Sequence, residues 1–104
     1  MYRVTTPTHT FTLPQDTSDY TEIQVSYQQG TTKLVKHYQD GTLPDGMTLD
    51  GNVVKIRLSQ AETKAFAKGN VEAQVRTLNA SGDAFASKIF ELYVNPVISE
   101  DILS

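Results

Sequence analysis

Two histidines, His9 and His37, are the side chains of this chain best suited to proton transfer or metal binding at neutral pH. Either role would need an oriented carboxylate or a third ligand nearby, and no HxH or HxxxH spacing is present. We interpret both as half-exposed strand residues and predict no catalytic residue. An enzyme would require one of them to meet carboxylates in a concave pocket.

Three aspartates raise the question of calcium. Asp40, Asp45 and Asp50 lie five residues apart, and each is followed directly by glycine. An EF-hand loop instead places oxygen ligands at alternate positions and ends on a glutamate. Asp-Gly pairs are typical of β-turns, which is the interpretation we favour. A surface calcium site built from several loops is the second interpretation, and the sequence by itself assigns no metal ligand.

Other cofactor and nucleophile patterns are absent from the sequence. The six glycines are scattered singly, so there is no phosphate-binding loop, and Ser81-Gly82-Asp83 lacks the G-x-S-x-G frame. The chain has no cysteine, which excludes disulfides and thiolate sites and fits an intracellular or virion protein. We therefore predict no cofactor and no enzymatic activity.

The charge balance and hydropathy argue against two classes of partner. The formal net charge is −3, so there is no basic field to attract nucleic acid. The N-terminal residues MYRVTTPTHT lack the pattern of a signal peptide, and no apolar run is long enough for a membrane span.

Alternating apolar and polar residues, bounded by turn residues, indicate β-strands along most of the chain. The inward positions of the expected strands are Ile23, Val25 and Tyr27; Val54, Ile56 and Leu58; Val71, Ala73 and Val75; and Phe90, Leu92 and Val94. The expected strands are residues 2–13 (split at Pro7), 21–28, 33–38, 52–58, 71–78 and 84–95, with one short strand between 41 and 51.

One short helical segment is expected before the strand at 71–78. Ser59 and Glu62 have capping-box spacing, which predicts helical turns from Ala61 through Phe66. Four tyrosines are assigned to sandwich packing: Tyr20, Tyr27, Tyr38 and Tyr93.

These patterns predict an all-β fold, an immunoglobulin-like antiparallel β-sandwich of about seven strands with one short helical turn. The sandwich domain is expected over residues 1–96 and a C-terminal tail over 97–104. The tail holds apolar side chains among acids, beyond the last strand. It is the predicted partner contact, with Val97, Ile98, Ile102 and Leu103 as contact residues.

A resemblance to a known family rests on four segments of the second half of the chain. They are residues 53–63 (VVKIRLSQAET), 69–76 (GNVEAQVR), 82–87 (GDAFAS) and 90–94 (FELYV). Their order resembles small Ig-like domains of tailed bacteriophages and prophages, in particular the N-terminal domain of baseplate upper proteins. Residues 11–14 and 23–29 match more loosely.

The resemblance implies a structural role and carries over no catalytic residue. A full baseplate protein continues into further domains, whereas this sequence ends shortly after Leu103. The resulting expectation is a small accessory or assembly subunit, located in the virion or in the bacterial cytoplasm before assembly.

Such a subunit would contact other phage structural proteins or itself, and not nucleic acid or a membrane. The alternative hypothesis is a carbohydrate- or host-surface-binding module, which predicts exposed aromatic side chains grouped on one sheet face or loop end. A small enzyme is the third hypothesis.

Overall fold

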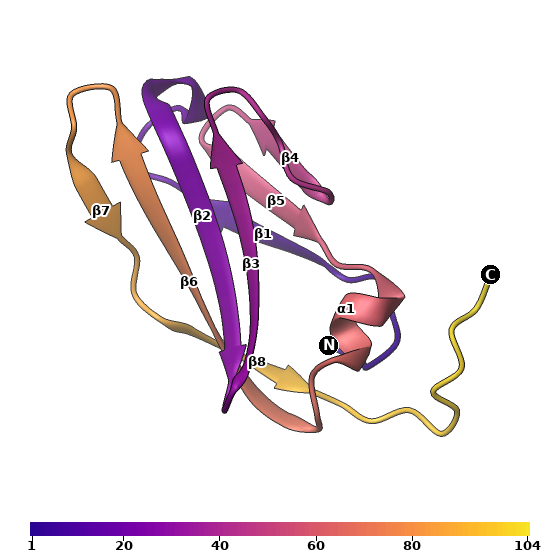
Figure 1. Ribbon diagram of the computed structural model, residues 1–104. Coiled ribbons are helices and arrows are strands. Elements are labelled where there is room, and N and C mark those ends of the chain that lie inside the picture. The colour runs from indigo at the N-terminus through magenta and orange to yellow at the C-terminus, as the bar shows by residue number, and fades with distance from the viewer.

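The computed structural model describes all residues, 1–104, and consists mainly of antiparallel strands in two facing sheets (Figure 1). The strands are β1 (Thr8–Thr12), β2 (Tyr20–Gln29), β3 (Thr32–Gln39), β4 (Met47–Asp50), β5 (Val53–Arg57), β6 (Gly69–Asn79), β7 (Ala84–Ala86) and β8 (Phe90–Val94). A 3-10 turn, η1 (Thr17–Asp19), precedes β2, and the α-helix α1 (Gln60–Lys64) follows β5. No helix has the length and apolar character needed to cross a membrane.

One sheet has the order β1-β5-β4, and the other has the order β3-β2-β6-β7, with β8 also pairing with β6. The all-β sandwich expected from the sequence is confirmed. The strand count is eight, one more than the estimate, because the last expected strand is divided.

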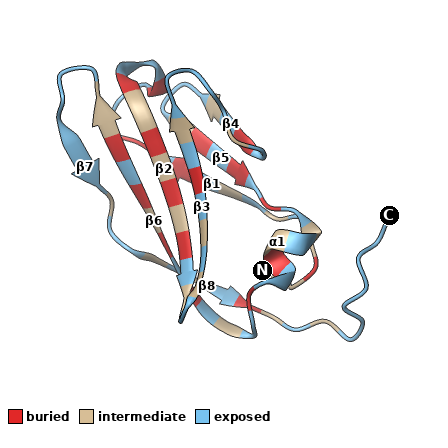
Figure 2. Ribbon diagram, in the orientation of Figure 1, coloured by how far each residue is buried: buried red, intermediate tan, exposed pale blue.

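The core lies between the sheets, where the inward residues of each strand meet (Figure 2). Ile23, Val25 and Tyr27 of β2 have no exposed surface, and neither do Val54 and Ile56 of β5. Each fully buried aliphatic side chain stabilises the fold by about 1.5–3 kcal/mol. The predicted strand phase is therefore confirmed. The remaining inward residues are also in place: Leu58, Val71, Ala73, Val75 and Val94 are buried, and Phe90 and Leu92 pack against the core partly buried.

The tyrosine assignments are right for three residues and wrong for one. Tyr20 and Tyr27 are buried and Tyr38 packs against the core, but Tyr93 is 49% exposed. Side chains alternate along β8, so a strand that buries Val94 must turn Tyr93 to the opposite face.

The single strand expected over residues 84–95 is wrong, because β7 and β8 are separated at Ser87–Ile89. Their registers on β6 differ by one residue: Leu78 pairs with Ala84, whereas Ala73 pairs with Phe90. Ser87 keeps the β7 register through one backbone bond, and its hydroxyl takes the place of its carbonyl in the other. Its hydroxyl accepts from the Val75 N–H at 3.0 Å, and its own N–H donates to the Val75 carbonyl at 2.8 Å. The extra residue is accommodated as in a β-bulge.

The capping box is confirmed at the start of α1. Ser59 Oγ accepts from the Glu62 N–H at 3.1 Å, and Glu62 Oε1 accepts from the Ser59 N–H at 2.8 Å. The helix ends at Lys64, earlier than expected, and Phe66 beyond it is fully buried. Thr63 fastens the N-terminal segment to the helix: its hydroxyl accepts from the Thr5 N–H at 3.0 Å and donates to the Thr5 carbonyl at 2.9 Å.

Candidate functional site

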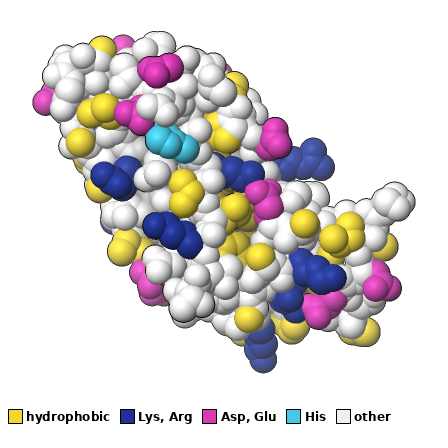
Figure 3. Space-filling model, viewed as in Figure 1, with side chains coloured by type: hydrophobic (Ala, Val, Ile, Leu, Met, Phe, Trp, Pro, Cys, Tyr) yellow, Lys and Arg dark blue, Asp and Glu magenta, His cyan; other side chains and the backbone are white.

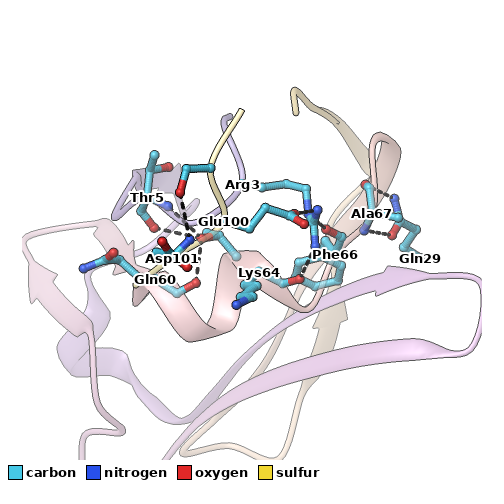
Figure 4. Close-up of polar contacts among 11 residues, drawn as sticks. Arg3, Thr5, Gln29, Gln60, Lys64, Phe66, Ala67, Glu100 and Asp101 are labelled. Carbon is cyan, nitrogen blue, oxygen red and sulfur yellow. Dashed lines mark hydrogen bonds and ion pairs between the residues drawn. The ribbon is translucent and has the colours of Figure 1, made fainter. Parts of the chain in front are cut away.

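The predicted contact segment, Val97–Ser104, leaves the sandwich after β8 and continues as an irregular coil to the C-terminus (Figure 1). Two polar tethers hold it (Figure 4). Gln60 on α1 donates from its side-chain amide to the Leu103 carbonyl at 2.7 Å and accepts from the Leu103 N–H at 2.8 Å. Glu100 forms an ion pair with Arg3.

Arg3 is itself fixed to the end of the helix. Its guanidinium donates to the carbonyls of Phe66 at 2.6 Å and Lys64 at 2.8 Å (Figure 4). Because the guanidinium is already positioned by these bonds, less side-chain entropy is lost when it pairs with a carboxylate. The segment is thus oriented by side chains of the N-terminal stretch and of α1.

The apolar side chains of the segment face solvent rather than the core. Ile98 is fully exposed, Leu103 is 77% exposed and Ile102 is 52% exposed, while Val97 is half-buried. Covering exposed aliphatic side chains with another apolar surface lowers the free energy of the system. The structure places three of the four predicted residues in position for such a contact. Their contact role stays a prediction.

The second candidate feature is the outer face of the five-stranded sheet. Two adjoining depressions of about 220 Å³ each lie on it, and both are lined by Gln24 and Arg76. Amide, acidic and basic side chains are interspersed on this face, and the space-filling view shows no patch of a single charge sign (Figure 3). The other polar lining residues are Glu22, Ser26, Gln28, Lys33, His37, Glu72, Gln74 and Thr77.

His37 meets a carboxylate on this face, one of the conditions set above for an enzyme. Its Nε2 lies 2.8 Å from Oε1 of Glu22, and both side chains are roughly a third exposed. Because solvent screens a pair this exposed, the interaction between the imidazole and the carboxylate is weak. The sequence contained a signal for this pair. In the β2–β3 hairpin His37 lies opposite Gln24, which makes Glu22 its diagonal neighbour on the same face.

His9 lies in a different environment, a polar cluster between the sheets beside α1. Its Nδ1 is 2.9 Å from the Tyr27 hydroxyl, and Lys36 Nζ lies 2.5 Å from Oε2 of Glu62. Burial, with a smaller effect of the Met1 amino charge, lowers the pKa of His9. Burial and the charge of Glu62 raise the pKa of Tyr27. The Tyr27 hydroxyl therefore stays protonated and can donate to a neutral imidazole.

Glu62 has two roles in this cluster. Partial burial opposes its ionisation, but hydrogen bonds from Lys36 and Ser59 outweigh that effect and lower its pKa. The side chain of Lys36 points inward from β3 and is only 7% exposed, so Glu62 supplies the charge that allows it to be buried. The cluster joins β1, β2, β3 and α1, and we assign it a structural role. Sequence reasoning did not foresee the Lys36–Glu62 pair, which joins distant segments.

The three Asp-Gly pairs form turns, as predicted. Gly41, Gly46 and Gly51 all have positive φ. No group of three or more His, Cys, Asp or Glu side chains in the chain is arranged to hold a metal ion.

Comparison of the chain with protein-family models, with curated proteins and with solved structures found no match.

Proposed function

We propose that this chain is a non-enzymatic assembly subunit that works through protein–protein contacts made by the Val97–Ser104 segment. The observation that carries the proposal is the exposure of Ile98, Ile102 and Leu103 on a segment fastened by polar tethers. A segment of this kind keeps its apolar side chains available, because the contacts that hold it use backbone and charged groups.

The setting we propose is the tail or baseplate of a tailed phage or prophage. Its support is the resemblance of residues 53–63, 69–76, 82–87 and 90–94 to Ig-like domains of such particles. The partners would be other phage structural proteins or further copies of this chain. The chain would then reside in the virion, or in the bacterial cytoplasm before assembly.

Light scattering across a concentration series tests the contact. We expect the full chain to form a defined oligomer and a chain lacking residues 98–104 to be monomeric. Both should show the same far-ultraviolet circular dichroism, because the segment contributes no residue to the core cluster. Ile98→Ser should weaken association, and Ser99→Ala serves as its control. A truncated chain that assembles like the full chain would refute the contact role.

The polar outer face of the five-stranded sheet supports a second candidate, a carbohydrate- or host-surface-binding module. Glutamine, arginine and carboxylate side chains around a depression are suited to hydrogen bonding with sugar hydroxyls. Two exposed aromatic side chains, Tyr2 and Tyr93, also share a face. Tyr2 forms a parallel β-bridge with Asn95, and Tyr93 of β8 lies two residues before Asn95, so both side chains lie on the same side as that of Asn95. Titration of bacterial cell-wall polysaccharide against the chain and an Arg76→Ala variant tests this candidate. Equal heats for the two proteins would argue against it.

A further inference from the structure

The eight-residue strand β3 is the longest strand edge in the molecule that no neighbour covers. It pairs only with β2, and it ends the five-stranded sheet. The other free edges belong to shorter strands, the three-residue β7, the four-residue β4 and the five-residue β1. The edge of β8 is partly covered by the N-terminal residues, since Asn95 N–H donates to the Met1 carbonyl and Arg3 N–H donates to the Asn95 carbonyl.

The direction of the backbone groups along β3 follows from its two ends. Asp40 N–H donates to the carbonyl of Thr21 in β2, whereas Gln39 exchanges backbone hydrogen bonds with Thr42 on the side away from β2. Backbone groups alternate between the two sides of an antiparallel strand. The N–H and C=O groups of Lys33, Val35 and His37 therefore point to the open edge. They have no backbone partner there, and an incoming strand could pair with them.

The C-terminal segment has the properties of a strand that could fill this edge. Its seven residues Val97–Leu103 nearly match β3 in length. Its backbone is almost free of intramolecular hydrogen bonds: Leu103 bonds the Gln60 side chain, and Asp101 N–H donates to Ser99 Oγ. The Gln60 amide pairs with Leu103 through one donor and one acceptor, as a neighbouring strand would.

The side chains are complementary in charge and polarity. If Ile98 and Ile102 face inward, they cover the half-buried Leu34 and Tyr38. Asp101 then lies on the outer face. There it meets the row of β3 that carries Lys33 and His37, both exposed. Glu100, between the two isoleucines, falls beside Lys36, whose charge Glu62 already neutralises. The charge complementarity therefore belongs to the outer face, and the inner face contributes apolar contacts.

We propose that the Val97–Leu103 segment of one copy adds as a strand to the free edge of β3 in a second copy. This inference rests on the proposed contact role of the segment and names its binding site. The two surfaces differ, so the contact is either exchanged reciprocally within a dimer or repeated head-to-tail in rings or open filaments. The polar tethers of the segment are exchanged for a full ladder of backbone hydrogen bonds.

Val35→Pro is the decisive variant, with Val35→Thr as its control. Proline removes an N–H that points to the open edge and leaves the β2 ladder intact, and it is tolerated on edge strands. Loss of that bond and the bulk of the ring should weaken association measured by light scattering about tenfold or more. The threonine variant keeps the N–H and should associate like the natural sequence.

The outcomes separate this inference from the proposed function. Association that needs residues 98–104 but is unchanged in Val35→Pro would overturn the β3 site and leave the contact role standing. A natural chain that stays monomeric at every concentration would also overturn the β3 site. The partner of the Val97–Ser104 segment would then have to be a different protein.

A charge exchange keeps the inference testable should the proline variant misfold. Lys33→Glu should weaken association several-fold, and combining it with Asp101→Lys should restore it. Failure of the double variant to recover any of the lost affinity would refute the proposed pairing.

Discussion

The attachment of the N-terminal segment to α1 can be tested by replacing one hydroxyl. Thr63 is fully buried, and its Oγ1 bonds both the N–H and the carbonyl of Thr5. Thr63→Val keeps the shape of the side chain, so no cavity forms, but it leaves both Thr5 groups without their partner. An unsatisfied buried polar group costs about 1–3 kcal/mol. We expect the free energy of unfolding to fall by roughly 2 kcal/mol, which lowers Tm by roughly 10 °C in a domain of this size.

The same substitution at Thr77 provides the matched control. Thr77 is also buried, at 4% exposure, but its Oγ1 has no hydrogen-bond partner. Thr77→Val removes a hydroxyl that is desolvated without compensation, so it should leave stability unchanged or raise it by up to about 1 kcal/mol.

Urea titrations followed by circular dichroism and by tyrosine fluorescence measure both variants, since the chain has no tryptophan. The predicted result is opposite or clearly unequal changes in the urea midpoint with the same slope. Equal changes in the two variants would refute the reasoning, because the bonds to Thr5 would then contribute nothing to stability.

Three further outcomes follow from the burial, titration and turn geometry. The free energy of unfolding should fall as the pH drops from about 7.5 to about 5, because the pKa of His9 is lowered in the folded state and the unfolded chain therefore takes up the proton first. Urea titrations at several pH values measure this decrease. The His9→Gln variant should lack the contribution of His9 to it. Ile56→Asp should unfold the domain in circular dichroism, whereas Lys55→Asp on the exposed face of the same strand should stay folded; a folded Ile56→Asp would mean that the strand phase is wrong. Gly46→Ala should lower Tm more than Gly82→Ala, since both have nearly the same positive φ but only at Gly46 would a Cβ collide with a carbonyl oxygen of β5; equal losses would contradict the collision.

The strand phases could be predicted from the sequence because they depend on local alternation. Val54 and Ile56 alternate with charged residues along their strand, and Val75 is flanked by polar residues along its own. A strand with one buried face can place all of these apolar side chains in the core in only one phase. The cap of α1 was equally accessible, since Ser59 and Glu62 satisfy each other's backbone groups within a single turn.

The division of the last strand was not accessible in this way. Residues 84–95 keep an extended, β-favouring composition throughout, yet β7 and β8 pair with β6 one residue out of register. The reason lies at Ser87, whose hydroxyl instead of its carbonyl bonds the Val75 N–H, so that one extra residue is accommodated before β8. Only the approach of β6 supplies that partner.

The site divides along the same line. The sequence alone indicated an apolar segment beyond the last strand, because Ile98, Ile102 and Leu103 follow Pro96 among acidic residues. The tertiary structure decided how that segment is held, since Gln60 and Arg3 come from parts of the chain far from it in sequence. It likewise left the edge of β3 open. Local patterns specify which way a side chain faces, whereas contacts between distant segments depend on packing that no local pattern encodes.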